Sequence, residues 1–416
     1  MINTTLIEEV INDQLDNFKR KDIGINRNID FEKYIRTKQI TVISGIRRSG
    51  KSTLLTQFAS RYKNYYYINF DDERLINFTV DDFHNLMLVF HKLYQADVIF
   101  LDEVQNIEGW ERFIRRIHDE DYKIFLTGSN ARLLSSELAT HLTGRYVKIE
   151  LYPFSFREYL SFHRIDYDVK TSKKKAIVLR YFDKYLRGGG FPEFVKSEDK
   201  EFLKRVYDDI LYRDILVRFR IKEAQAFKNL SAFLFTNFTK EASYNSLKNS
   251  LGFKSLTSVK NYIGFMEESF LIFALPRYDH SLKKQIASGR KIFVIDNGLR
   301  NIVSFYFSED EGRLLENLVF IELKRRQKEI FYFREKGECD FIVRTGTKIT
   351  EAIQVSLDLR TGANEEREIT GILKALEYFK LKSGIILTKH KSDTIRKNGF
   401  TIRLIPIWEW LLGPGP

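Results

Sequence analysis

The residues with the clearest chemical potential lie in the sequence GIRRSGKST, between positions 45 and 53. The spacing fits G-x-x-x-x-G-K-[ST], with a β-branched run before it and helical apolar spacing after it. A strand, a glycine-bearing loop and a helix N-terminus present backbone N–H groups to phosphate oxygens. Lys51 is expected to reach the β and γ phosphates, and Ser52 to hold Mg²⁺ through its hydroxyl. The pattern therefore predicts an ATP or GTP site made by Gly45, Ile46, Arg47, Arg48, Ser49, Gly50, Lys51, Ser52 and Thr53.

Two further apolar runs end in polar residues. ADVIFLDEVQ at 96–105 places Asp102 and Glu103 at the end of a predicted buried strand, the edge where ligands bind in open α/β sheets. Asp102 can support the Mg²⁺ shell and Glu103 can polarise an attacking water. YKIFLTGSN at 122–130 ends in Thr127, Ser129 and Asn130, of which one side chain could orient that water.

An arginine, Arg145, precedes the next predicted strand in TGRYVKIEL. An arginine at this place is positioned to reach the γ-phosphate of a neighbouring subunit and to stabilise developing charge. The alternative is an arginine solvated at the start of a strand.

These motifs occur in a fixed order: GIRRSGKST, VIFLDEVQ, LTGSNARLL, LTGRYVKIELYPFSFREYL and GGGFPEF. As a set they resemble the archaeal and bacterial AAA+ ATPases in which a P-loop domain is fused to a winged helix and a nuclease-like C-terminal domain. The resemblance implies that Lys51 and Ser52 bind ATP and Mg²⁺, and that Asp102 and Glu103 are the metal-supporting and catalytic acids. It also implies a sensor at Ser129 or Asn130.

The same resemblance places Arg145 as an arginine finger acting in trans, so a homo-oligomer is expected. ILYRDILVRFR at 210–220 resembles the helical lid of the family, in which Arg213 is either a second sensor or an exposed helix charge. RGGGFPEF at 187–194 is interpreted as a turn between two helices, using the backbone freedom of glycine and proline.

Residues 240–278 combine helical spacing, a glycine stop at Gly252, a second helical pattern and a β-prone run. This order indicates a winged helix-turn-helix, and the resemblance supports it. Side chains suited to phosphates and base edges fall on or near its second helix: Lys254, Ser255, Ser258, Lys260 and Asn261. Winged helices also dock proteins, so both DNA binding and scaffolding stay open.

From 289 onward the predicted order is helix, three strands, helix and strand, the core of the PD-(D/E)xK nuclease fold that the resemblance also implies. Glu316 and Asp340 fall where two metal-binding acids belong, Gln354 replaces the third, and Ser356 stands where a lysine is expected. Asp358 lies beyond the site.

A basic group from the following helix, Arg367 or Lys374, could replace the missing lysine. An active nuclease, a degenerate nucleic-acid-binding or scaffolding domain, and an unrelated sheet are all possible, and the degenerate domain is favoured.

Composition limits the class of protein. The chain has 416 residues, 43% of them hydrophobic, a net charge of +12 and one cysteine, Cys339. Such a charge favours polyanions, although biased codon usage also produces it. Without a disulfide framework, a signal-like N-terminus or an apolar run long enough for a bilayer, a cytoplasmic protein with no membrane contact is expected.

The resulting prediction is an α/β chain with a parallel-sheet P-loop AAA+ domain, a helical lid, a winged helix and an α/β nuclease-like domain. The expected boundaries are 1–36 for an N-terminal helical segment, 37–152 for the P-loop domain and 153–238 for the helical lid. The winged helix is expected at 239–285 and the nuclease-like domain at 286–416. The expected function is Mg²⁺-dependent ATP hydrolysis that repositions the C-terminal modules, most simply on DNA. The alternatives are a nucleotide-dependent protein-binding adaptor and an ATP-gated nuclease.

Overall fold

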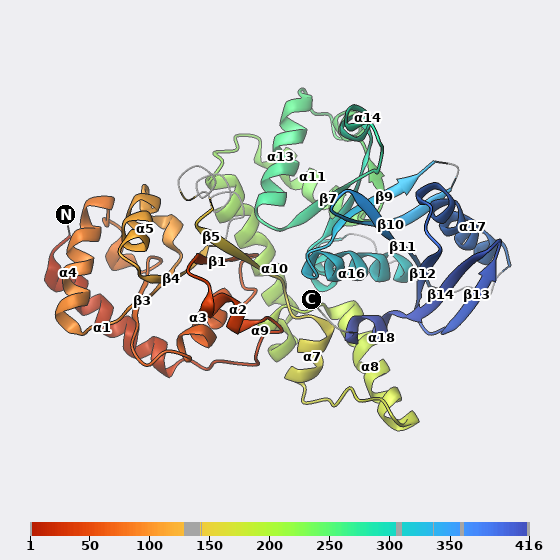
Figure 1. Ribbon diagram of the computed structural model, residues 1–416. Coiled ribbons are helices and arrows are strands. Elements are labelled where there is room, and N and C mark those ends of the chain that lie inside the picture. Colours follow the sequence, from red (N-terminus) through yellow and green to blue (C-terminus); the bar gives the residue numbers. More distant parts are fainter. Residues whose placement is uncertain are drawn as a thin grey trace. The chain divides into compact units, whose positions relative to one another are not determined.

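The computed structural model describes residues 2–128, 142, 144–304, 310–335, 337–357 and 362–413, with backbone alone for 362–365. The chain divides into two compact units, Met1–Tyr152 and Pro153–Pro416 (Figure 1). Within the described residues, no helix has the length and apolar character needed to cross a membrane.

A five-stranded parallel sheet forms the centre of the first unit, in the order β2-β3-β4-β1-β5. The strands are β1 (Ile40–Gly45), β2 (Tyr66–Asn69), β3 (Val98–Asp102), β4 (Lys123–Gly128) and β5 (Tyr146–Leu151). All residues of β1 and β3 are buried. This burial on both faces is what the near-continuous apolar runs predict for a parallel sheet covered by helices. The α/β fold expected for the P-loop domain is therefore confirmed.

Two apolar cores cover the two faces of this sheet. Val42 and Leu101 face one core, whereas their neighbours Ile43 and Phe100 face the other, as the alternation of side chains along a strand requires. The covering helices are α1 (Thr4–Arg20), α2 (Phe31–Arg36), α3 (Lys51–Ala59), α4 (Phe83–Leu93) and α5 (Trp110–Asp119). Helix α1 contributes to both cores, so the N-terminal segment is an integral part of this unit.

The second unit begins with helices: α7 (Phe156–Phe162), α8 (Ser172–Gly188), α9 (Pro192–Ser197), α10 (Lys200–Asp209), the π-helical segment η5 (Ile210–Val217) and α11 (Ala224–Thr236). The glycine-rich turn between α8 and α9 lies where the sequence predicts it. At Gly189, where φ is +75°, a Cβ would lie 2.0 Å from Asp296 Oδ1. Asp296 Oδ2 in turn accepts a hydrogen bond from Gly190 N at 2.7 Å. Gly189 is therefore required by the close approach of this turn to Asp296.

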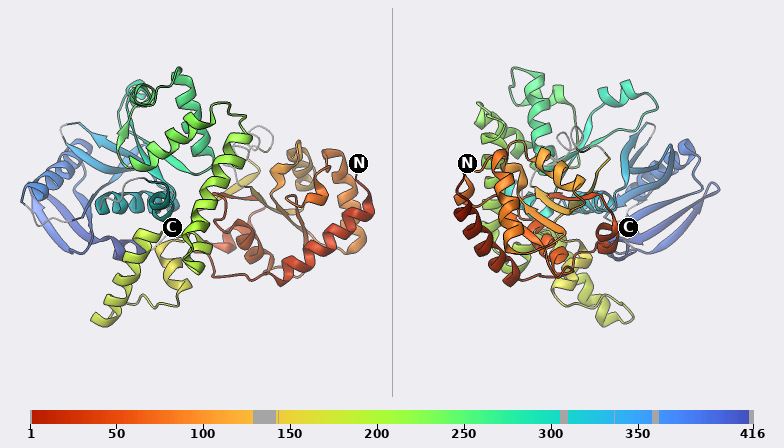
Figure 2. Two further views of the ribbon diagram at one scale, coloured as in Figure 1. Left: turned by 180° about the vertical axis from the view of Figure 1, so that it is seen from behind. Right: turned by 60° about the vertical axis from the view of Figure 1, so that its left-hand side comes forward.

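Residues 224–294, in green in Figures 1 and 2, continue from α11 into a small antiparallel sheet ordered β6-β8-β7. Its elements are β6 (Glu241–Ala242), α12 (Tyr244–Ser250), α13 (Leu256–Glu268), β7 (Ile272–Pro276), α14 (Leu282–Ala287) and β8 (Arg290–Val294). A parallel bridge between Arg277 and Tyr332 links this segment to the C-terminal sheet.

The C-terminal sheet has six strands in the order β13-β14-β12-β11-β10-β9. Its elements are α15 (Asn297–Val303), α16 (Glu311–Arg325), β9 (Glu329–Arg334), β10 (Glu338–Thr345), β11 (Lys348–Ser356), α17 (Gly362–Phe379), β12 (Ser383–Thr388), β13 (Asp393–Lys397), β14 (Phe400–Pro406) and α18 (Ile407–Leu412). The pairing is antiparallel from β9 to β11 and parallel from β11 through β12 to β14. Ile372 and Leu376 of α17 pack in the core of this sheet.

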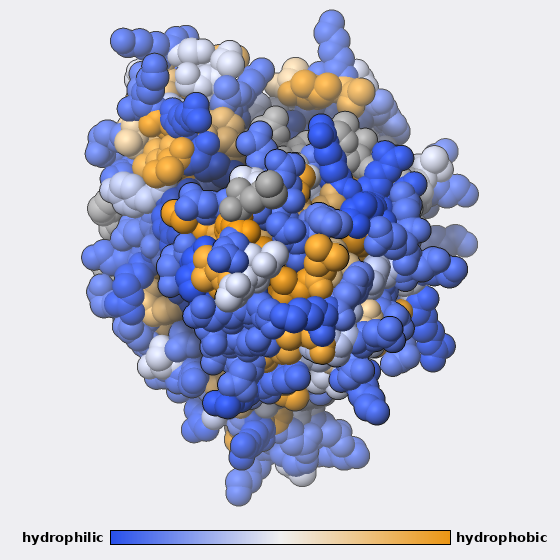
Figure 3. Space-filling view, turned by 90° about the vertical axis from the view of Figure 1, so that its left-hand side faces the viewer, coloured by the Kyte–Doolittle hydropathy of each residue, from blue (hydrophilic) through white to orange (hydrophobic). Residues whose placement is uncertain are grey.

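The surface is mostly hydrophilic, with separate hydrophobic areas on the face seen in Figure 3. Ile76 and Leu88 are examples of exposed large apolar side chains in the first unit. Scattered apolar residues of this kind are normal on a folded protein.

Candidate functional site

The loop from Gly45 to Ser52 connects β1 to α3, as the motif predicts. Its backbone departs from ordinary conformations, with φ of +155° at Gly45, +65° at Arg48 and +95° at Gly50. A Cβ on Gly45 would lie 2.1 Å from the carbonyl oxygen of Leu151, so only glycine fits there. The result is a tight loop that ends at the N-terminus of a helix, the backbone arrangement that binds phosphate.

Lys51 is buried in this loop, and its Nζ donates to the carbonyl oxygens of Gly45 and Ile46, both at 3.2 Å. Ser52 follows in the first turn of α3 and is partly exposed. The ammonium and the hydroxyl are thus held beside the same loop, where the motif requires them.

Strand β4 lies between β1 and β3 in the sheet, so its end separates the phosphate loop from the acids of β3. Thr127 Oγ1, at that end, donates to Asp102 Oδ1 and accepts a hydrogen bond from Glu103 N at 3.0 Å. Asp102 is 2% exposed. The threonine therefore holds the Asp102 carboxyl and the backbone of Glu103, whereas the sequence offered Thr127 only as one of three strand-end residues that could orient the attacking water.

Glu103 follows the end of β3 and has a left-handed backbone with φ of +52°. Its Oε2 accepts a hydrogen bond from Gln105 Nε2 at 2.5 Å. Burial, with the Asp102 charge adding to it, raises the pKa of Glu103 above its ordinary value, and the nearby charge of Lys51 opposes the shift. A carboxyl group with a raised pKa beside an ammonium is suited to accept a proton near neutral pH.

Sequence reasoning missed Arg27. Its Nη1 donates to the carbonyl oxygen of Ser49 at 3.2 Å and its Nη2 to that of Tyr152 at 2.5 Å. The segment that carries it is fastened to α3, because Gln57 Nε2 donates to the carbonyls of Ile23 and Ile25. Arg27 thereby joins the phosphate loop, at Ser49, to the residue that follows β5, Tyr152. No spacing or motif around position 27 marks this role.

The remaining predicted residues of the nucleotide site lie elsewhere or outside the described residues. Arg145 precedes β5 at the opposite edge of the sheet from Lys51, and its Nη1 pairs with Asp119 Oδ1 at 2.5 Å. Arg213 is exposed on η5 in the second unit. Ser129 and Asn130 fall outside the described residues.

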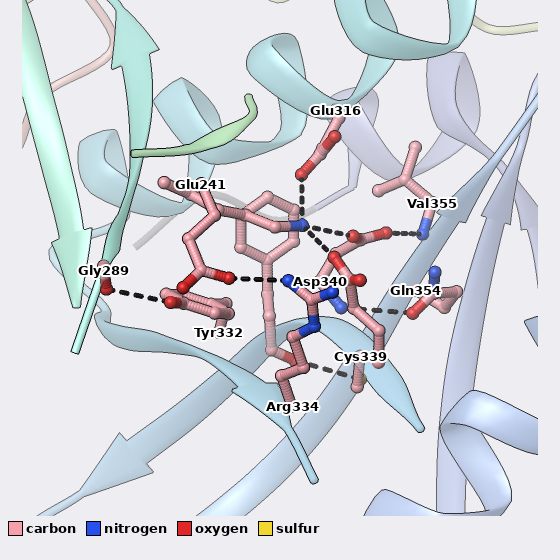
Figure 4. Close-up of polar contacts among 12 residues, drawn as sticks. Glu241, Gly289, Glu316, Tyr332, Arg334, Cys339, Asp340, Gln354 and Val355 are labelled. Carbon is pink, nitrogen blue, oxygen red and sulfur yellow. Dashed lines mark hydrogen bonds and ion pairs between the residues drawn. The ribbon is translucent and has the colours of Figure 1, made fainter. Parts of the chain in front are cut away.

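A second group of charged residues lies in the second unit, around Lys291 of β8. Lys291 Nζ is 3.0 Å from Glu316 Oε1, 2.8 Å from Glu338 Oε1 and 3.0 Å from Asp340 Oδ1. We call these three acids and Lys291 the carboxylate centre. Figure 4 shows Glu316 and Asp340 approaching one point from α16 and β10.

Gln354 lies where a third acid was expected, and both its amide oxygen and its amide nitrogen form hydrogen bonds. Its Oε1 accepts from Asp340 N at 3.1 Å and its Nε2 donates to Glu368 Oε2 at 2.5 Å (Figure 4 shows the first of these contacts). Arg367, one candidate for the missing basic group, pairs with the same Glu368 at 2.7 Å. Asp358 falls outside the described residues.

The basic side chain that reaches the acids is therefore Lys291, which the sequence analysis did not single out. It comes from the small sheet, and its position could be found only from the pairing of β8 with its neighbours. Burial alone would lower the pKa of Lys291, but the three carboxylates raise it well above its usual value. Burial and the charge of Asp340 raise the pKa of Glu316 to about 8.

These residues line a groove of about 1160 Å³. Basic and acidic side chains both line it: Lys240, Lys291, Arg313, Arg334, Arg367 and Lys374, with Glu241, Glu316, Glu338, Asp340, Glu366 and Glu368. In the part of the chain that the structure describes, no three His, Cys, Asp or Glu side chains are arranged to hold a metal ion.

Comparison with known proteins gives two family matches. A model described as an AAA domain matches residues 37–160, and a domain of unknown function matches residues 179–310. The first match spans the parallel sheet and its phosphate loop.

Two curated relatives are similar over almost the whole chain. An uncharacterized protein of Methanocaldococcus jannaschii is 37% identical, over 98% of this chain and 95% of its own. An uncharacterized protein of Haemophilus influenzae is 31% identical, over 90% of this chain and 95% of its own.

Among solved structures, a replication initiator DnaA bound to AMPPCP and single-stranded DNA is 17% identical. It covers 57% of this chain and 85% of its own, with a TM-score of 0.27, a likeness too weak to support an inference. The curated relatives and the domain match carry the assignment: the chain belongs to the same family as these archaeal and bacterial proteins, and it contains an AAA domain.

Proposed function

We propose that the chain is a Mg²⁺-dependent ATPase whose first unit binds and hydrolyses ATP. The observation that carries this proposal is the arrangement of Lys51, Asp102 and Thr127 at the carboxyl ends of three parallel strands. The matched AAA domain supports it. ATP hydrolysis needs positioned phosphates, a metal and an oriented water, and little covalent chemistry from the protein.

Each residue has a defined role in this proposal. The backbone of Gly45–Ser52 and the Lys51 ammonium bind the phosphates, while the Ser52 hydroxyl and Asp102 hold Mg²⁺ directly or through water. Glu103 accepts a proton from the attacking water, since burial raises the pKa of its carboxyl. Thr127 keeps Asp102 and the backbone of Glu103 in place.

The second unit is proposed to act on DNA. The succession of α11, β6, α12, α13 and the β7–β8 hairpin supports a winged helix-turn-helix, in which α13 would be the recognition helix. Lys254, Lys260 and Asn261 are exposed on or beside α13. The net charge of +12 favours such a polyanionic partner.

The C-terminal sheet is proposed to be a nuclease-like domain. The order of α16, three antiparallel strands, α17 and the parallel strand β12 supports this proposal. The resemblance of the sequence to AAA+ ATPases adds a homo-oligomer in which Arg145 reaches a neighbouring nucleotide, with Arg213 as a second sensor. In such an assembly, Arg145 would leave its ion pair with Asp119 and contact a phosphate of the neighbouring nucleotide.

The test is an ATPase assay with and without single- and double-stranded DNA. Mg²⁺-dependent phosphate release, stimulated by DNA and lost in Lys51→Ala, is the expected result. Lys38→Ala is the matched control, because Lys38 is exposed before β1 at the opposite edge of the same sheet. Equal turnover in Lys51→Ala would contradict the ATPase assignment, and turnover that DNA leaves unchanged would contradict the coupling.

A protein-binding adaptor is the second candidate, and the carboxylate centre favours it. The two acids expected to hold metal in a nuclease, Glu316 and Asp340, are instead paired with Lys291. Fluorescence anisotropy of labelled DNA at two salt concentrations separates the candidates. Salt-dependent binding supports DNA as the partner, since phosphate contacts release counterions. Absence of binding at both concentrations would favour the adaptor.

A further inference from the structure

The carboxylate centre poses a problem of charge. Glu316, Glu338 and Asp340 come from α16 and β10, and their oxygens converge within 3.0 Å of one atom, Lys291 Nζ. Carboxylates at this density are normally stabilised by a metal or by a basic partner, since unpaired buried charge is costly. Here the side chain of Lys291 is only 6% exposed, so the ammonium lies inside the group of acids.

Asp340 and its neighbour Gln354 have further hydrogen-bond partners. Asp340 Oδ2 accepts a hydrogen bond from Val355 N at 3.0 Å, while its Oδ1 faces Lys291. The Gln354 amide oxygen accepts from Asp340 N. Both carboxylate oxygens of Asp340 and the amide oxygen of Gln354 therefore already accept hydrogen bonds within the protein.

Other basic residues of the groove have different partners. Arg334 pairs with Glu241 at 2.7 Å, and Arg367 pairs with Glu368. Lys240, the neighbour of Glu241, is exposed, and its Nζ lies 3.4 Å from Asn237 Oδ1. Among these residues, Lys291 is the one whose cation contacts three acids at once.

We propose that Lys291 occupies the place of a metal ion in the carboxylate centre and thereby keeps divalent cations out of it. The ammonium brings one positive charge to the point on which the three acids converge, and its hydrogen bonds use the oxygens that would otherwise ligate a cation. Because Lys291 lies on β8, the same contact joins the small sheet to α16 and β10. The carboxylate centre is thus an internal ion cluster that holds two parts of the second unit together.

This inference does not depend on ATP hydrolysis, so its test omits nucleotide. Mn²⁺ binding is measured by electron paramagnetic resonance at about pH 8, where about half of the Glu316 carboxyl, whose pKa is raised to about 8, is ionised. The proteins are wild type, Asp340→Asn, Lys291→Ala, Lys291→Ala combined with Asp340→Asn, and Lys240→Ala. The last variant removes a lysine from the same groove without touching the three acids.

Lys291→Ala is expected to gain one Mn²⁺ site at least about 10-fold tighter than any Asp340-dependent binding by wild type. Bound Mn²⁺ should raise its Tm by roughly 3 °C at a concentration about ten times the Kd. Both gains should disappear in the double variant and be absent in Lys240→Ala. Failure of Lys291→Ala to gain Mn²⁺ binding would overturn the inference.

Wild type and Asp340→Asn give an independent answer if Lys291→Ala does not fold. Equal Mn²⁺ binding by these two proteins is expected, because Lys291 already occupies the centre. Weaker binding by Asp340→Asn than by wild type would show a metal at Asp340 in the presence of Lys291, and would overturn the proposal.

Discussion

The two units each contain a buried lysine at the centre of a polar site, but the lysines have different surroundings. Lys51 donates to backbone carbonyls of its own glycine-bearing loop, at 3.2 Å. Lys291 is in contact with three carboxylates at 2.8–3.0 Å. A cation that contacts three carboxylates is largely neutralised, whereas the hydrogen bonds described for Lys51 go to backbone carbonyls, with the charge of Glu103 nearby. These surroundings support the ligand-binding role proposed for Lys51 and the structural role proposed for Lys291.

The largest expected effect is on nucleotide binding. Lys51→Ala removes the cation that we propose contacts the β and γ phosphates, so we expect at least about a 100-fold loss of ATP affinity, consistent with a charge-assisted contact of about 3 kcal/mol. Titration of a fluorescent ATP analogue measures it, with Lys38→Ala as control. Wild-type ATP affinity in both variants would contradict the ligand-binding role of Lys51.

The second effect concerns stability. Lys291→Ala leaves Asp340, Glu316 and the more exposed Glu338 without their shared cation, and we expect the free energy of unfolding to fall by about 3 kcal/mol. Urea denaturation in EDTA measures the loss. Lys240→Ala, on the surface of the same groove, should change it by less than about 0.5 kcal/mol. Equal effects of the two variants would contradict a structural role for Lys291.

The third effect separates binding from chemistry in the first unit. Glu103→Gln should retain ATP binding but lower kcat by about 100-fold, because an amide cannot accept the proton of the attacking water. In wild type, burial raises the pKa of Glu103, so kcat should fall on acidification at a higher pH than an ordinary glutamate would give. The ionised fraction, and with it the rate, decreases as pH falls through that raised pKa.

The pH profile of steady-state kcat measures this decrease in rate on acidification. A glutamine variant with wild-type kcat would show that Glu103 is not the proton acceptor. A wild-type profile that stays flat down to about pH 4 would show that its carboxyl does not limit the rate.

The smallest effect is expected at Thr127. Thr127→Val keeps the shape of the side chain but removes the hydroxyl that donates to Asp102 and accepts from Glu103 N. Because such supporting groups orient metal-binding and catalytic residues, we expect about a 10-fold fall in kcat. The Mg²⁺ dependence of the rate should shift to higher concentration as well. Unchanged kinetics would show that the strand ends hold the acids without this contact.

The first unit was predictable because its signals are local. The phosphate loop follows directly from GIRRSGKST, and the buried strands follow from continuous apolar runs. The order of strands then brings Thr127 between Lys51 and Asp102, which explains why three separate motifs form one site. Arg27 was missed because its partners are backbone carbonyls of distant residues, and no sequence pattern records such contacts.

The carboxylate centre was predictable only in part. Glu316 and Asp340 could be placed from the order of helices and strands, and the structure brings them together. Their cation could not be placed, since Lys291 precedes Asp340 by 49 positions and belongs to another sheet. The sequence offered Arg367 and Lys374, on the helix that follows β11, as replacements for the missing lysine. Tertiary packing placed the basic group on β8 instead.

Phosphate release from ATP in the presence of Mg²⁺, measured side by side for wild type and Lys51→Ala, is the sharpest test of the proposed ATPase activity. We expect wild type to release phosphate in a Mg²⁺-dependent reaction, and the variant to release it at least about 100-fold more slowly. Turnover by Lys51→Ala at the wild-type rate, or its complete absence from folded wild-type protein with and without DNA, would contradict it.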